Sequence, residues 1–393
     1  MNQQNFKNLI FVYVSLVIVS CSHDSNNVEL VDSRRGKYDI IDSTKLFSDS
    51  TSFEFLNIDK ISEGTILAFQ YPILNLSLLN SKGKLIKEIN RQGNLKGNFS
   101  CQFIDCKWFE EYLYVLEEGN KFGIIIYDKN LNFVKAVNFN KYFLNSFVFP
   151  KVTSFEIIRK NKNIEMLLSI ANDRYNYYTP DYYLNSSSVA VVKMENMDVK
   201  DVKYVLPYKS FDSISNSITV DKRMWNNPNV FFQYSDGMLY LKYNFDDIIY
   251  VVDINDYKII DMIKMNIVYS PKDKEFVSFS KPDNVPRRAI KNMMKLSYVN
   301  SELQSFLLKK NKIYALYNIP TNREKIQDSP VGLNKMSIES VVYVIDLKTK
   351  KQNHYVFNNS FNFSSLYADD NYVYLTSNQF ITENPYLYKI KLL

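Results

Sequence analysis

The stretch that decides the fold runs from Tyr112 to Val137 and reads YLYVLEEGNKFGIIIYDKNLNFVKAV. It holds an alternating apolar run at Tyr112–Leu116, a second run at Gly123–Tyr127, the polar turn Asp128–Asn130 and a third run at Phe133–Val137. Polar turn residues between runs of aromatic and β-branched residues are typical of strands joined by hairpins. This stretch therefore predicts three consecutive antiparallel strands.

The three-strand pattern of Tyr112–Val137 occurs six times along the chain, with the last copy incomplete. The other copies, in chain order, are Ile66–Phe69 with Leu76–Leu79 and Leu85–Ile89; Met166–Ile170 with Val189–Val192 and Val199–Val205; Leu239–Tyr243 with Ile248–Val252 and Lys258–Ile263; Ile313–Tyr317 with Val341–Ile345 and Gln352–Phe357; and Tyr372–Thr376 with Tyr386–Leu392. Asn80, Asp128, Asp253 and Asp346 open the clear turns, at spacings of 48, 125 and 93 residues, and the Met166 copy lies in the 125-residue interval. Multi-stranded repeats of this length favour propeller blades over a solenoid.

The sixth copy ends before its outermost strand, because the sequence stops at Leu393. An unpaired strand edge is a liability for pairing with other chains. The segment Lys37–Asp42 precedes the first complete copy and has no local partner, so we expect it to supply the missing strand. The sequence thus predicts an all-β fold in which residues 37–393 form a six-bladed β-propeller closed by an N-terminal strand. An open sandwich of two sheets is the alternative.

The composition supports a folded chain with a large core. Of the 393 residues, 46% are hydrophobic and 15% aromatic, including 30 Tyr and 27 Phe, which excludes a disordered protein. Only 9 Gly and 11 Pro exclude a collagen-like chain, and 2 His with 3 Cys argue against zinc sites or a disulfide scaffold.

Residues 1–20 indicate an export signal. Lys7 precedes an apolar run from Leu9 to Val19. As a helix of about 1.5 Å per residue this run is too short to span a bilayer, and it is typical of a signal-peptide core. The four residues Ile18–Cys21 resemble a bacterial lipobox, which implies acylation and cleavage at Cys21; an ordinary signal peptide is the alternative. Ser22, in place of Asp after the cysteine, resembles the pattern of lipoproteins that are sorted to the outer membrane. Residues 21–36 would then form a polar tether.

The overall plan resembles the TolB-like six-bladed propeller lipoproteins of unknown function found in Bacteroidetes-type bacteria. Three segments carry the resemblance: the lipobox, the loop Arg91–Phe99, and Ile313–Tyr317. The loop resembles a Gly-x-Gly-Pro-Gly-Glu-Phe motif after the first blade, from which Asn94, Lys96 and Asn98 depart. The resemblance implies the propeller fold and no known activity.

Catalysis finds little support in the sequence. His23 lies in the tether and His354 in an expected outer strand, so a Ser-His-Asp or histidine metal site is disfavoured. Lactonase-type propellers resemble this architecture and hold a central divalent cation with Glu, Asn and Asp. Candidates for such a site are Glu117, Glu118, Asp173, Asp246 and Asp247. The leading expectation is a protein without metal or cofactor, in which Cys101 and Cys106 are separate buried thiols.

Two segments are candidate binding surfaces. Tyr175, Tyr177, Tyr178, Tyr182 and Tyr183 form a dense aromatic stretch that would stack on sugars or proteins if exposed, or pack over neighbouring blades if buried. Residues 281–312 hold eight basic and two acidic residues, and a helical insertion is expected near 284–300. Arg288, Lys291 and Lys295 would share one face of it, as an anionic-surface or partner site or as a solvated face.

Three classes of function remain. The leading one is a non-enzymatic binding or scaffold module, anchored to the outer membrane through Cys21, that recognises an envelope protein or a glycan through loops on the propeller faces. The second is a propeller hydrolase or lyase with a central divalent cation, and the third is a structural subunit of an envelope complex. We expect a monomer on either the periplasmic or the cell-surface face. Nucleic acid is disfavoured because the charge outside residues 281–312 is nearly balanced.

Overall fold

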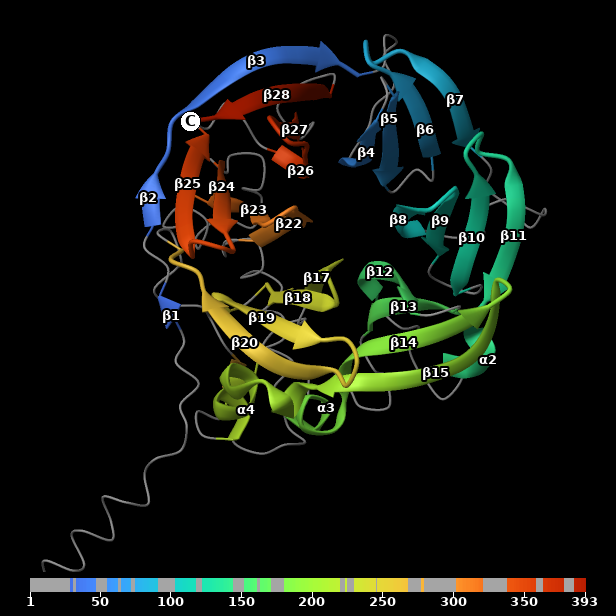
Figure 1. The fold of residues 1–393 in the computed structure, drawn as a ribbon, viewed down its shortest axis with the longest axis vertical. Helices are drawn as coiled ribbons and strands as arrows, with labels where there is room; N and C mark the ends of the chain where they lie inside the picture. Colours follow the sequence, from blue (N-terminus) through green and yellow to red (C-terminus); the bar gives the residue numbers. More distant parts are fainter. Residues whose placement is uncertain are drawn as a thin grey trace, which may run out of the picture.

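The computed structural model describes residues 29–30, 33–46, 55–62, 65–71, 75–90, 103–117, 122–143, 152–160, 163–170, 180–219, 223–224, 230–244, 246–267, 277–278, 302–320, 338–357, 363–377 and 385–393. Six antiparallel sheets surround a common centre in these residues (Figure 1). The innermost strand of each sheet contacts the innermost strands of both neighbours, and the ring of contacts is complete. The expected six-bladed propeller is therefore confirmed, and the open sandwich is excluded.

Blades 1 to 5 each run outward in chain order. Blade 1 has β4 (Phe55–Ser62), β5 (Thr65–Tyr71), β6 (Asn75–Asn80) and β7 (Leu85–Asn90); blade 2 has β8 (Phe103–Phe109), β9 (Tyr112–Glu117), β10 (Gly123–Asp128) and β11 (Phe133–Asn138). Blade 3 has β12 (Val152–Lys160), β13 (Asn163–Ile170), β14 (Ser187–Glu195) and β15 (Asp198–Pro207); blade 4 has β17 (Val230–Ser235), β18 (Met238–Tyr243), β19 (Ile248–Asp253) and β20 (Lys258–Lys264).

Blade 5 has β22 (Glu302–Lys309), β23 (Lys312–Pro320), β24 (Ile338–Asp346) and β25 (Lys351–Phe357). Blade 6 has β26 (Phe363–Ala368), β27 (Val373–Ser377) and β28 (Tyr386–Leu392), followed outward by β3 (Tyr38–Lys45). The remaining described elements are short: α2 (Asn140–Phe143), α3 (Pro180–Asn185), the 3-10 turn η1 (Tyr208–Ser210), α4 (Asp212–Thr219), and the pair β16 (Arg223–Met224) and β21 (Val277–Ser278). The helical insertion expected near 284–300 lies outside the described residues.

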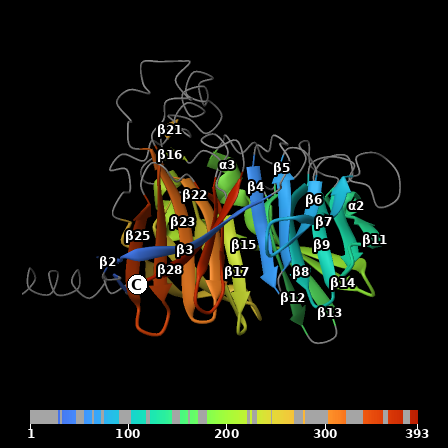
Figure 2. The same cartoon turned by 90° about the horizontal axis from the view of Figure 1, so that it is seen from above.

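The N-terminal segment closes the ring, as the sequence predicts. β3 pairs antiparallel with β28, with Leu392 opposite Tyr38 and Tyr386 opposite Lys45. Residues 21–36 are more than a tether, because two pieces of this segment also form strands. β1 (Glu29–Leu30) adds in parallel to the outer edge of blade 4, and β2 (Ser33–Arg35) adds in parallel to that of blade 5 (Figure 1). Figure 2 shows β2 and β3 on the same side of the molecule, beside β25 and β28. One segment therefore lies along the outside of three consecutive blades.

The core lies between the blades. Six clusters of buried side chains in the described residues correspond to the six blade interfaces. In β9, Leu113 and Val115 contact the cluster toward blade 1, while Tyr114 and Leu116 contact the cluster toward blade 3. Both faces of a middle strand are thus buried, and each fully buried aliphatic or aromatic side chain contributes about 1.5–3 kcal/mol.

The turns between the third and fourth strands explain why the sequence repeat is visible. Asn80, Asp128, Asp253 and Asp346 each accept a hydrogen bond through Oδ1 from the main-chain N–H two residues later, at 2.8–3.0 Å. A residue with positive φ then completes each turn: Gly83, Leu131, Tyr257 and Lys350. Asp and Asn are favoured here because their short side chains can replace a main-chain acceptor.

Gly83 provides a test of closure at the junction of blades 6 and 1. Its φ is +74°, and a Cβ there would overlap the main-chain carbonyl oxygen of Lys45, at the end of β3. Gly237 has a φ of +81° in the β17–β18 turn, with open space around it. Gly237→Ala should therefore cost only the left-handed strain of about 1–2 kcal/mol. Gly83→Ala should lower the free energy of unfolding by more, as measured in urea; equal losses would contradict this account of the junction.

Candidate functional site

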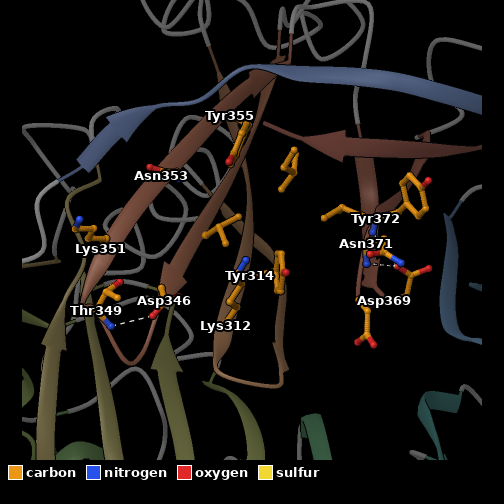
Figure 3. A pocket seen from close by; sticks show the side chains of 14 residues that line it. Lys312, Tyr314, Asp346, Thr349, Lys351, Asn353, Tyr355, Asp369, Asn371 and Tyr372 are labelled. Carbon is orange, nitrogen blue, oxygen red and sulfur yellow. Dashed lines mark hydrogen bonds between the residues drawn. The ribbon is translucent and has the colours of Figure 1, made fainter.

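A cleft of about 290 Å³ opens between blades 5 and 6, at the end of the ring that carries the short turns (Figure 3). One wall is a face of β23, β24 and β25; the other is the β26–β27 turn with the ends of β27 and β28. The lining residues are Lys312, Tyr314, Val344, Asp346, Thr349, Lys351, Asn353, Tyr355, Asp369, Asp370, Asn371, Tyr372, Val373 and Leu392.

The register of blade 5 orders its wall in three rows. Lys312, Asp346 and Lys351 are directly opposite one another across the three strands. The next row is Tyr314, Val344 and Asn353; the third is Leu316, Val342 and Tyr355, of which only Tyr355 lines the cleft. Because directly opposed residues point to the same face of a sheet, the wall changes from charged at the rim to apolar at depth.

The wall from blade 6 is held by one carboxylate. Asp369 accepts hydrogen bonds through Oδ1 from the main-chain N–H groups of Asn371 and Tyr372, both at 2.8 Å, and through Oδ2 from the Tyr374 hydroxyl at 2.7 Å. The Lys389 ammonium lies 4.0 Å from the centre of the Tyr372 ring. These contacts fix the turn that faces the rows of blade 5.

Two cations of the cleft form no close ion pair with a described carboxylate. Lys310 and Asp370 bridge the two blades at the rim, with Nζ and Oδ2 2.8 Å apart. Lys312 and Lys351 form no ion pair within 4.0 Å with any described residue. Their ammonium groups therefore remain available as donors at the edge of the cleft.

The carboxylates that frame the cleft are ionised at neutral pH. The main-chain N–H of Thr349 is the main cause that lowers the pKa of Asp346. Burial alone would raise the pKa of Asp369, but hydrogen bonds from Asn371, Tyr374 and Tyr372 and the charge of Lys389 together bring it below its usual range. Burial raises the pKa of the Tyr314 and Tyr355 phenols, which stay neutral. The cleft thus presents fixed anions, two cations and neutral hydroxyl groups.

The N-terminal segment supports the deep row of the cleft. Gly36 follows β2, and its N–H donates to the His354 carbonyl at 2.9 Å. A Cβ on Gly36 would overlap the ring of Tyr355, so the chain passes directly against that ring. Tyr355 is consequently buried between the segment and the cleft.

A second polar group lies on the inner strands of blades 2 and 3. Lys107 in β8 and Glu156 in β12 form an ion pair of 3.3 Å. Burial raises the pKa of the neighbouring Asp105 to about 6, although the charge of Lys107 and the Cys106 N–H, 2.8 Å from Oδ1, act in the opposite direction. Since this pKa lies above that of the unfolded chain, the contribution of Asp105 to folding becomes less favourable as the pH rises from about 4 to 6.

The described members of the carboxylate set proposed for a central cation do not form one cluster. Glu117 is buried at the end of β9, whereas Asp246 lies in blade 4, where it pairs with Lys242 at 3.3 Å and accepts from the Tyr250 hydroxyl at 2.9 Å. Asp247 is its neighbour, and Glu118 and Asp173 lie outside the described residues. In the part of the chain that the structure describes, no group of three or more His, Cys, Asp or Glu side chains is placed to hold a metal ion.

The structure describes two of the five tyrosines of the aromatic stretch. Tyr182 and Tyr183 belong to α3 and are 0% and 1% exposed. They pack against Tyr208, with ring centres 5.4 and 5.6 Å from it, in the core between blades 3 and 4. These two tyrosines therefore pack between blades, as one of the two alternatives predicted. They leave no exposed ring face for stacking on a ligand. Tyr175, Tyr177 and Tyr178 lie outside the described residues.

Several other candidates also fall outside the described chain: Cys21, His23, Cys101, Arg288, Lys291 and Lys295. His354 is buried in β25, and burial, followed by the charge of Arg35, lowers its pKa. Cys106 is buried in β8 between blades 1 and 2. Among the described residues, no helix is long and apolar enough to cross a membrane.

Comparison with solved structures shows the same architecture in proteins of distant sequence. The chain matches the crystal structure of a member of the DUF4221 family from Bacteroides vulgatus with a TM-score of 0.61 and 12% identity, covering 92% of this chain and 99% of that one. It matches a putative exported protein from Bacteroides fragilis with a TM-score of 0.55 and 9% identity, over 92% and 98% of the two chains. Likeness at this identity shows the fold alone. Neither a protein-family model nor a curated protein matches the chain in sequence.

The cleft was not identified from the sequence. Its polar rows are visible as alternation, with Lys312 before Tyr314 and Lys351 before Asn353. The facing wall, however, comes from a turn in another blade, and only the closed ring brings it opposite these residues.

Proposed function

We propose that this protein is an outer-membrane lipoprotein that acts as a non-enzymatic binding module, with the cleft between blades 5 and 6 as its ligand site. The observation that carries the proposal is the combination of a hydrogen-bonded frame with ammonium donors that form no close ion pair. Asp346 and Asp369 are fixed by their turns, while Lys312 and Lys351 have no ion-pair partner among the described residues. Ligand sites typically place a few oriented polar groups over an apolar floor.

The anchor part of the proposal is supported by the sequence. Ile18–Cys21 resembles a lipobox, and the wider plan resembles the TolB-like lipoproteins. Glu29, the first residue of β1, follows Cys21 by eight residues and pairs with Ile263 at the outer edge of blade 4. At about 3.6 Å per residue, the intervening chain reaches at most about 29 Å. An acylated Cys21 would therefore keep this edge of the propeller close to the membrane.

Replacing Cys21 tests the anchor. Expressed with its signal in a Gram-negative host, the wild type should partition into the detergent phase, because several acyl chains bind membranes firmly. Cys21→Ala should move to the aqueous phase, and Cys101→Ala, the matched control, should not. Detergent partitioning that is unchanged by Cys21→Ala would contradict the anchor.

Methyl NMR tests the ligand site. Val344, Val373 and Leu392 line the cleft, so any molecule bound there should shift their methyl resonances. Val134 is 40% exposed on β11 of blade 2 and serves as a reference methyl outside the cleft. The probes are four classes of small molecule: neutral hexoses, uronic acids, dipeptides and nucleoside monophosphates. A binding module should respond to at least one class at the three cleft methyl groups.

The same spectra distinguish binding from catalysis. In a binding module the probe signals remain unchanged during prolonged incubation, whereas a hydrolase or lyase would convert the probe. No response at the three cleft methyl groups to any class, or an equal response at Val134, would overturn the cleft as the ligand site.

A further inference from the structure

The charges of the cleft lining restrict the chemistry of its ligand. The lining contains three aspartates and two lysines. The charge of one aspartate, Asp370, is neutralised at the rim by its ion pair with Lys310. The other charged lining residues are Asp346 and Asp369, with two negative charges, and Lys312 and Lys351, with two positive charges. A charged ligand of either sign would be attracted by one of these pairs and repelled by the other. The lining therefore offers no net excess of counter-charge to an anion or to a cation.

The lining offers donors and acceptors side by side. In the rim row, the Asp346 carboxylate stands between the ammonium groups of Lys312 and Lys351 in the strand register. In the facing turn, Asp369 is two residues from the exposed amide side chain of Asn371. A hydroxyl group both donates and accepts a hydrogen bond, so it can bridge such mixed neighbours. Carbonyl and phosphate oxygens accept only, so they could use the ammonium groups but would gain nothing from the carboxylates.

The floor and the size of the cleft complete the description. Val344, Val373 and Leu392 provide an aliphatic surface beside the polar rim, suited to the C–H face of a ring. The volume of about 290 Å³ lies just below the usual range of ligand pockets, about 300–1,000 Å³, and suits a small ligand. Resting on the proposed function of the cleft, we infer that its ligand is a neutral sugar, bound as a single hexose unit.

Three probes with the same ring test the inference directly. Glucose, glucuronic acid and glucosamine share most ring substituents and carry no charge, one negative charge and one positive charge; galactose, galacturonic acid and galactosamine form a second series. Titrated by methyl NMR at Val344, Val373 and Leu392, the neutral member of at least one series should bind most tightly. We expect its Kd to be about fivefold lower than that of the uronic acid, the size of one solvated charge contact.

A charge variant separates recognition from folding. Asp346→Asn removes one carboxylate from the cleft, yet Asn80 caps the corresponding turn of blade 1, so an Asn at 346 can keep the turn. Asp253→Asn makes the same change in the turn of blade 4, outside the lining. Asp346→Asn should reduce the preference for glucose over glucuronic acid several-fold, and Asp253→Asn should leave it unchanged.

An amide variant tests the contacts themselves. Asn371 and Asn130 are both exposed and both follow a turn-capping aspartate by two residues, donating their main-chain N–H to it at 2.8 Å. Asn371→Ala should weaken hexose binding several-fold, and Asn130→Ala should not change it.

These experiments distinguish failure of the sugar assignment from failure of the cleft as a ligand site. Tighter binding of the uronic acids, or of dipeptides or nucleotides in place of sugars, would overturn the sugar assignment and leave the cleft as a binding site. An unchanged charge preference in Asp346→Asn would also overturn the assignment. A cleft that responds to no probe would overturn both this inference and the proposed function.

Discussion

The pairing of the first long strand with the last one is the constraint on which the rest of the structure depends. β3 and β28 come from opposite ends of the sequence, yet they share a register from Tyr38 opposite Leu392 to Lys45 opposite Tyr386. Without β3, the outer edge of β28 would carry unpaired main-chain groups, which is the situation that native sheets avoid. The same segment lies beside blades 4 and 5 before it reaches blade 6. Ring closure is therefore shared by three blades.

The cleft depends on this closure at both walls. On the blade-5 side, the chain at Gly36 passes against the ring of Tyr355, a buried lining residue of β25. On the blade-6 side, Leu392 lies in the strand that β3 pairs with. The rows of charged and amide groups can face the Asp369 turn only while blade 6 stays in place. The N-terminal segment thus links the fold to the proposed ligand site.

The sequence revealed the outer three strands of each blade and missed the innermost ones. The outer strands are joined by turns that need Asp or Asn, and their middle strands are buried on both faces, so both signals are strong. The innermost strands are mixed in composition, as in FLNIDKIS of β4 and ELQSFLLK of β22. Register shifts in five of the six innermost strands also interrupt the two-residue alternation on which the prediction rests.

The candidate site was beyond sequence reasoning for a different reason. A reader of the sequence sees Lys312, Asp346 and Lys351 at separate positions, and only the strand register makes them neighbours. The tyrosines of α3 gave a stronger signal in sequence, but the burial of Tyr182 and Tyr183 assigns them to the core. Residue type alone could not distinguish an exposed platform from aromatic packing.

A cross-link between the two ends of the chain tests the central claim most directly. Asp39 and Lys391 are opposed in the β3–β28 ladder and both are exposed, so cysteines at the two positions would lie within disulfide range. In a background with Cys21→Ala and Cys101→Ala, the pair Asp39→Cys and Lys391→Cys should oxidise to an intramolecular disulfide that raises the unfolding temperature. A control pair, Glu88→Cys in blade 1 with Lys391→Cys, should stay reduced. Failure of the first pair to form, or equal oxidation of the control, would contradict closure of the ring by β3.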